Sequence, residues 1–201
     1  FSELNLKGDF RIGDINNYQK LKSFIDEVQP EIIFHLAAQP LVRDSYEDPL
    51  GTYQTNVIGT GNLLQACRGV ESLKAIVCIT TDKCYENTGI KTGYKENDPM
   101  GGKDIYSGSK GAADLIFKSY YYSFFNSKKS NVRLAVARAG NVIGGGDWAQ
   151  NRIVVDCVEA WSKGQIVEIR SPTKKDEFVI FKTYQYGINI LLLAPFDIVF
   201  E

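Results

Sequence analysis

The stretch that decides the fold is Glu31-Ile-Ile-Phe-His-Leu-Ala-Ala-Gln39. Residues 31–36 form a short, nearly continuous apolar run, which is typical of a strand buried on both faces of a parallel sheet. A helix that begins after Asn16-Asn17 is expected before this strand, because apolar residues recur there near helical spacing until Pro30. A second helix is expected after it, from about Pro49 to Cys67.

The same alternation continues in both directions along the chain. Buried strands are expected at 74–80 and 132–138, with a long helix at 104–125 between them. Short strands at 10–12 and 166–169 and a helix at 152–163 complete the pattern. Strands separated by helix-length segments require right-handed crossovers, and therefore predict an α/β fold with a doubly wound parallel sheet. Such sheets bind ligands outside the carboxyl ends of their strands.

Composition narrows the classes of function. The chain of 201 residues is 44% hydrophobic and 23% charged, which is ordinary for a globular domain, and its net charge of −1 disfavours nucleic acid as a partner. No apolar run reaches the ~20 residues that cross a bilayer. The single histidine, His35, excludes multi-histidine metal sites. The four cysteines have no metal-ligand spacing, so we expect no metal and a cytoplasmic protein with reduced thiols.

Two segments that follow strands carry groups suited to a site. In His35-Leu-Ala-Ala-Gln39, the small Ala37 and Ala38 let the backbone approach a ligand closely, although a plain tight turn explains them equally well. We interpret His35 itself as a packed strand residue rather than a catalyst. In Thr80-Thr-Asp-Lys83, hydroxyls, a carboxylate and an ammonium follow one another at a strand end, where they are costly to bury without a function. A solvated turn is the alternative.

The third segment, Tyr106-Ser-Gly-Ser-Lys110, lies at the start of the long helix. Positions i and i+4 share a helix face, so the Lys110 ammonium can approach the Tyr106 phenol. A nearby cation lowers the pKa of a tyrosine from its usual value of about 10, which makes the tyrosine usable as a base near neutral pH. Such a pair alone is a weak signal. Combined with the two preceding segments in this order, it becomes strong.

These landmarks, together with Asp14-Ile15 and Asn56, resemble those of the extended short-chain dehydrogenases/reductases that act on nucleotide sugars. Longer stretches at 80–87, 97–102 and 137–148 are similar to the CDP-glucose 4,6-dehydratases. Lys83 stands where the dTDP-glucose enzymes carry Glu. The resemblance runs from about Phe10 to Pro172 and implies a Rossmann-like sheet.

The resemblance implies that NAD+ accepts a hydride from carbon 4 of CDP-glucose and returns it to carbon 6, giving CDP-4-keto-6-deoxyglucose. Tyr106 would take the 4-hydroxyl proton, with Thr81 sharing the hydrogen bond. Lys110 would tune Tyr106 and hold the nicotinamide ribose. Lys83 or a neighbour would remove the proton on carbon 5, while Asp82 would protonate the departing 6-hydroxyl. A pair of groups with opposed protonation preferences suits such an elimination.

Binding roles follow from the same resemblance. The expected contacts to NAD come from Asp14, Ile15, Ala37, Ala38, Gln39, Asn56, Tyr106 and Lys110. Asn141 and Arg152 are expected to contact the diphosphate of the nucleotide sugar, because amide and cationic groups donate well to phosphate oxygens. Gly144-Gly-Gly146 is interpreted as a substrate loop that Trp148 closes. A homo-oligomer is expected for the full-length form. A nucleotide-sugar epimerase and a non-catalytic remnant are the alternatives.

The resemblance also predicts a division of the chain. Residues 1–148 would form the NAD-binding domain without its first βα unit, which carries the Gly-rich turn, and 149–172 would begin a substrate-binding lobe. Residues 173–201 are unlike the family and are interpreted as the product of a shifted reading frame or of a truncated gene. We therefore expect a Rossmann-like fold that is incomplete at both ends.

Overall fold

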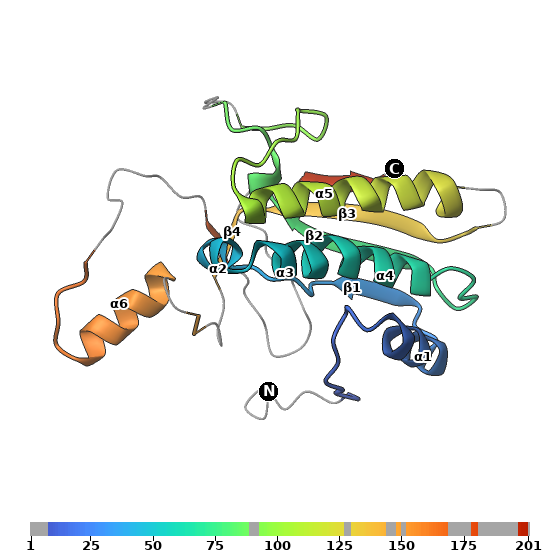
Figure 1. Ribbon diagram of the computed structural model, residues 1–201, viewed down its shortest axis with the longest axis horizontal. Coiled ribbons are helices and arrows are strands. Elements are labelled where there is room, and N and C mark those ends of the chain that lie inside the picture. Colours follow the sequence, from blue (N-terminus) through green and yellow to red (C-terminus); the bar gives the residue numbers. More distant parts are fainter. Residues whose placement is uncertain are drawn as a thin grey trace. The chain divides into compact units, whose positions relative to one another are not determined.

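The computed structural model describes residues 8–88, 93–126, 130–143, 148–149, 152–168, 178–180 and 197–200 (Figure 1). Two compact units make up the chain: the first contains 1–137 and 198–201, and the second contains 138–197. The predicted domain boundaries at 148 and 172 stay predictions.

A four-stranded sheet has the strand order β1-β2-β3-β6. Its strands are β1 (Ile32–His35), β2 (Ala75–Thr81), β3 (Arg133–Ala139) and β6 (Asp197–Phe200). β1 and β2 are parallel, with Ile32 beside Ala75 and His35 beside Cys78. Parallel neighbours joined through helices confirm the predicted α/β, doubly wound class of fold.

Helices connect these strands, and Figure 1 shows α4 and α5 running side by side along the sheet. The helical segments of the first unit are α1 (Tyr18–Val28), α2 (Val42–Glu47), α3 (Pro49–Tyr53), η2 (Gln54–Ile58), α4 (Gly59–Ala66), η3 (Asp82–Cys84), α5 (Ile105–Tyr120) and η4 (Tyr121–Phe125). The second unit contains β4 (Asn141–Ile143), α6 (Ile153–Ser162) and β5 (Phe178–Ile180), and β4 pairs in parallel with β5. The predicted helices at 49–67, 104–125 and 152–163 are confirmed, although the first two contain π-helical turns, η2 and η4.

Side-chain caps explain where three of the helices begin. The Asn17 side chain accepts a hydrogen bond from the Lys20 backbone N–H, as predicted for α1. The Asp48 carboxylate accepts from the Gly51 backbone N–H at the start of α3. The Asp104 carboxylate accepts from the Ser107 backbone N–H at 2.9 Å at the start of α5. Each such cap is worth about 1 kcal/mol.

The core lies between the sheet and the helices that carry the predicted apolar faces. Leu64 of α4 and Ile76 of β2 are fully buried, and Phe117 of α5 packs in the same cluster. Cys67 and Cys78 lie in this cluster too, and the four cysteines are free thiols. No helix among the described residues is long and apolar enough to cross a bilayer.

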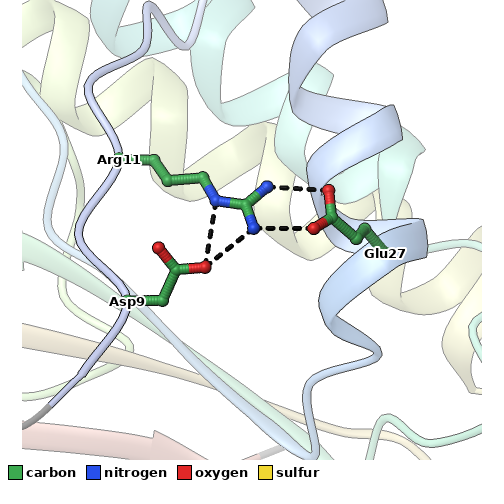
Figure 2. A network of polar contacts seen from close by, with 3 residues as sticks. All are labelled: Asp9, Arg11 and Glu27. Carbon is green, nitrogen blue, oxygen red and sulfur yellow. Dashed lines mark hydrogen bonds and ion pairs between the residues drawn. The ribbon is translucent and has the colours of Figure 1, made fainter.

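Three predictions about strands are wrong. Residues 10–12 form no strand, and Phe10 and Ile12 are exposed. Instead, Arg11 ties this segment to α1 by donating to the carboxylates of Asp9 and Glu27, at 2.7 and 2.6 Å from one guanidinium nitrogen (Figure 2). Residues 166–168 form no strand either. β1 is not buried on both faces, because Ile32 and Phe34 are 55% and 61% exposed while His35 is buried.

Candidate functional site

The end of β2 brings the Thr81-Asp82-Lys83 segment to the carboxyl edge of the sheet. Thr81 is buried, and its hydroxyl donates to the Asp82 carboxylate at 3.1 Å while accepting from the Lys83 backbone N–H at 3.3 Å. The Lys83 ammonium lies 3.8 Å from the Asp82 carboxylate, and both side chains are about half exposed. A hydroxyl, a carboxylate and an ammonium therefore stand together at the edge where such sheets bind ligands.

α5, which carries Tyr106 in its first turn, packs on the same strand and places Lys110 against it. Lys110 is 7% exposed, and its ammonium donates to the Ile79 carbonyl at 2.9 Å, two residues before Thr81. Burial lowers the pKa of Lys110, while the neighbouring Cys78, Cys84 and Asp114 act in the opposite direction. The contact to Ile79 fixes the lysine beside the Thr81 segment. The approach of the Lys110 ammonium to the Tyr106 phenol stays a prediction.

Asn56, in the π-helical turn η2, connects the loop after β1 with α5. Its side chain is buried. The side-chain carbonyl accepts a hydrogen bond from the Gln39 backbone N–H at 2.8 Å. The side-chain NH2 donates to the Gln39 backbone carbonyl at 3.1 Å and to the Ser109 hydroxyl at 2.8 Å. The Ser109 hydroxyl donates in turn to the Tyr106 carbonyl at 2.7 Å. Asn56 therefore positions the backbone around two predicted site segments. Sequence reasoning missed Ser109, whose only signal is its place between Tyr106 and Lys110.

The loop after β1 is also held by its own side chains. The Gln39 amide donates to the Thr52 hydroxyl at 2.9 Å and to the Leu41 carbonyl at 3.0 Å, so it is directed into the protein. Ala37 is exposed and Ala38 is half-buried, so their backbones remain approachable. This arrangement leaves the small alanines as the groups a ligand can contact closely.

His35 is a packed residue of β1, as predicted. It is 6% exposed, and its Nε2 lies 2.9 Å from the Thr60 hydroxyl oxygen. The Thr60 hydroxyl donates its one hydrogen to the Asn56 backbone carbonyl at 2.7 Å. The hydroxyl oxygen can therefore only accept from His35, so Nε2 carries the hydrogen and is the donor. Burial, with a smaller contribution from the charge of Lys110, lowers the pKa of His35 to about 4. The ring is therefore neutral at neutral pH.

Asp14 and Ile15 form a turn that packs on α4. The exposed Asp14 carboxylate accepts from the Asn16 N–H at 2.9 Å, and the Asn62 side chain donates to the Ile15 carbonyl at 3.1 Å. A Cβ on Gly59 would lie 2.7 Å from the Ile15 side chain, so glycine permits this close approach. The turn is thus fixed relative to α4.

The remaining predicted residues belong to the second unit. Asn141 begins β4 and Arg152 directly precedes α6, and both are partly buried. Trp148 is 68% exposed. Gly144-Gly-Gly146, the predicted substrate loop, lies outside the described residues. Within the described part of the chain, no group of three or more His, Cys, Asp or Glu side chains could hold a metal ion.

Comparison with known proteins identifies what this chain is similar to. A family model described as GDP-mannose 4,6 dehydratase matches residues 2–135. A CDP-glucose 4,6-dehydratase of Salmonella typhimurium is 51% identical over 172 residues, which are 84% of this chain and 48% of that protein. The chain therefore spans about half the length of this relative. The identity confirms the resemblance that the long motifs indicated.

Solved structures agree on the fold. The UDP-glucose 4-epimerase of Thermus thermophilus, in complex with NAD, matches with a TM-score of 0.69 and 25% identity over 84% of this chain and 55% of that one. The UDP-glucose 4-epimerase of Thermotoga maritima matches with a TM-score of 0.76 and 21% identity over 88% of this chain and 57% of that one.

Proposed function

The chain belongs to the GDP-mannose 4,6-dehydratase family, and from this premise we propose that it carries the catalytic part of an NAD-dependent nucleotide-sugar 4,6-dehydratase. The observation that carries the proposal is the cluster at the end of β2, where Thr81, Asp82 and Lys83 stand next to the carbonyl that holds Lys110. The relative that is 51% identical over 84% of the chain supports CDP-glucose as the substrate and CDP-4-keto-6-deoxyglucose as the product.

The residues fit a nicotinamide nucleotide. Lys110 is buried, and among the described residues its ammonium has one acceptor, the Ile79 carbonyl, so two of its three N–H donors remain for a ligand. The backbones of Ala37 and Ala38 and the turn at Asp14-Ile15 would hold the rest of the cofactor. When bound, NAD+ accepts the hydride from carbon 4 and returns it to carbon 6.

The protein's own groups would move the protons. Tyr106 removes the proton of the 4-hydroxyl as the hydride leaves carbon 4, and the Thr81 hydroxyl hydrogen-bonds the same oxygen. The Lys83 ammonium first gives a proton to the neighbouring Asp82 carboxylate, which leaves a neutral amine beside a carboxylic acid. The ketone acidifies carbon 5, whose proton passes to the Lys83 amine. The bond from carbon 6 to its oxygen then breaks, and the Asp82 carboxylic acid donates a proton to the departing oxygen, which leaves as water. Lys83 returns a proton to carbon 5 as the hydride is added at carbon 6. The close Lys83–Asp82 pair at 3.8 Å supports paired acid and base roles.

Two residues of the second unit would bind the substrate. Asn141 and Arg152 would donate to the diphosphate, since amide and guanidinium groups bind phosphate oxygens well. Residues 1–148 would serve as the NAD-binding domain and 149–172 as the start of a substrate lobe.

We place the protein in the cytoplasm, where free thiols such as those of its four cysteines stay reduced. We also propose a homo-oligomer.

One assay tests the proposed reaction. The purified chain is incubated with CDP-glucose and NAD+, and mass spectrometry follows the loss of one water from the nucleotide sugar. Tyr106→Phe and Asp82→Asn should each lower the rate by about 100-fold or more, because each removes a proton-transfer group. Tyr122→Phe is the matched control, since Tyr122 is 56% exposed on η4 and should leave the rate unchanged.

The other outcomes point to the alternatives. An isomer of unchanged mass would identify an epimerase and contradict the acid and base roles of Asp82 and Lys83. No turnover and no binding of NAD+ would contradict the enzyme proposal for this chain and favour a non-catalytic remnant.

A further inference from the structure

Thr80 is a buried polar residue whose hydroxyl makes no hydrogen bond to the described residues. The residue is 6% exposed, and its Oγ1 has no hydrogen-bond partner in the described part of the chain. A hydroxyl that is buried without a partner loses its hydrogen bonds to water and forms none in the protein. Its burial therefore costs folding free energy, so such groups need an explanation.

Other buried threonines of this chain are satisfied. The Thr52 hydroxyl donates to the Asp48 carbonyl at 2.9 Å, and the Thr60 hydroxyl donates to the Asn56 carbonyl at 2.7 Å. Even the adjacent Thr81 hydroxyl donates to the Asp82 carboxylate. Burial of a threonine in this protein thus does not by itself leave its hydroxyl without a partner, and the place of Thr80 on β2 must explain why its hydroxyl has none among the described residues.

That position is beside Lys110. Side chains alternate along a strand, so Thr80 shares a face of β2 with Cys78 and Ile76, which pack in the core with Phe117 of α5. The Lys110 ammonium donates to the Ile79 carbonyl at 2.9 Å, and this carbonyl belongs to the peptide unit that joins Ile79 to Thr80. The unpaired hydroxyl and the two remaining N–H donors of Lys110 thus flank one peptide unit at the end of β2.

We propose that Thr80 is a further cofactor contact: its hydroxyl binds the vicinal hydroxyls of the nicotinamide ribose, which the resemblance already assigns to Lys110. This proposal rests on the proposed use of NAD. A ribose hydroxyl both donates and accepts, so a threonine hydroxyl, which also does both, can complete the pair with a lysine that only donates. The bond left unmade without ligand is then made in the complex.

Two substitutions isolate the hydroxyl. Thr80→Val keeps the shape and removes the oxygen, whereas Thr80→Ser keeps the oxygen. In the ligand-free protein, Thr80→Val should leave the melting temperature unchanged or raise it, because no internal hydrogen bond is lost. Thr60→Val is the matched control: it removes a buried hydroxyl with two partners and should lower the melting temperature by about 2–4 °C or more.

Calorimetric titration with NAD+, ADP-ribose and ADP locates the contact. Thr80→Val should weaken binding of NAD+ and ADP-ribose by about five- to tenfold, the loss expected for one hydrogen bond, and should leave ADP binding unchanged because ADP lacks the second ribose. Thr80→Ser should bind all three ligands within about twofold of the unsubstituted chain.

Each contrary result identifies what has failed. Equal NAD+ affinity in Thr80→Val and the unsubstituted chain would overturn the Thr80 contact and leave the proposed function standing. A melting temperature of Thr80→Val lowered as far as that of Thr60→Val would show that the hydroxyl has a structural partner, such as a buried water, and would also overturn it. Failure of the unsubstituted chain to bind NAD+ would overturn the proposed function, and the Thr80 contact with it.

Discussion

At the scale of single residues, burial fixes the protonation state of His35. The ring is enclosed between β1 and α4, where its Nε2–H is bound to Thr60. A protonated ring would have to lose its hydration near the Lys110 ammonium, and this explains why the pKa of His35 falls to about 4. Histidine at a strand end suggests a catalyst, yet here it serves as a neutral hydrogen-bond donor.

The lowered pKa predicts how stability depends on pH. In the unfolded chain His35 takes up a proton near its ordinary pKa of about 6.5, whereas the folded chain resists it down to about 4. The stabilisation is therefore complete above pH ~6.5 and is lost as the pH falls towards 4, by up to about 3 kcal/mol. Urea unfolding of the unsubstituted chain and of His35→Gln across this range measures it. A pH dependence equally steep in His35→Gln would contradict the assignment.

At the scale of elements, the π-helical turn η2 positions Asn56. A π turn adds one residue to a helical turn, and such insertions are frequent at functional sites because they change the direction of a side chain. The turn lies between α3 and α4 and faces α5. From it Asn56 makes three hydrogen bonds that join the loop after β1 to the helix carrying Tyr106. One side chain thus sets the spacing of two site segments.

Loss of Asn56 should therefore loosen this connection. Asn56→Ala should lower the free energy of unfolding by about 3 kcal/mol, the sum of three buried hydrogen bonds at about 1 kcal/mol each. Asn56→Asp should be damaging as well, because a carboxylate cannot donate to Ser109 or to the Gln39 carbonyl. Urea unfolding measures both. Asn62→Ala is the control: Asn62 is less buried and should cost about 1 kcal/mol. Wild-type stability in Asn56→Asp would refute the positioning role.

Sequence reasoning located most elements but not their details. The apolar runs at β2 and β3 and the capped α1 and α5 were predictable, because period and capping residues are local signals. The π turn was not, since a helix with one extra residue has nearly the same apolar pattern. Ser109 was missed for a similar reason: its use depends on a contact with Asn56, 53 residues away. The predicted strand at 10–12 lacked a partner strand, which no local pattern reveals.

At the scale of the whole molecule, apolar surface on the helices bears on the proposed homo-oligomer. Leu50 of α3, Ile58 of η2, and Leu115 of α5 are large apolar side chains that are 81%, 47% and 55% exposed. α5 packs beside both α3 and α4, and Gly61 of α4 approaches Ile116 of α5. A second copy of the chain would remove this apolar surface from water, which stabilises association.

Sedimentation equilibrium tests the homo-oligomer. We expect the unsubstituted chain to self-associate and Leu115→Lys to shift it towards the monomer by at least about tenfold in dissociation constant, because the ammonium would be buried at the interface. Ile166→Lys is the control, since Ile166 is 96% exposed and lies away from these helices in the sequence. A monomeric unsubstituted chain would contradict the homo-oligomer.

The open face of β1 has a consequence for how the chain behaves in concentrated solution. Among the described strands, β1 lies at the edge of the sheet, and it exposes Ile32 and Phe34. The free edge of a strand with exposed apolar residues offers backbone hydrogen bonds to any extended segment, so such edge strands nucleate aggregates. Glu31 and Lys74, which pair at 3.0 Å across the start of the strand, place charges there. We therefore expect Glu31 and Lys74 to affect the colloidal stability of the chain more than its free energy of folding.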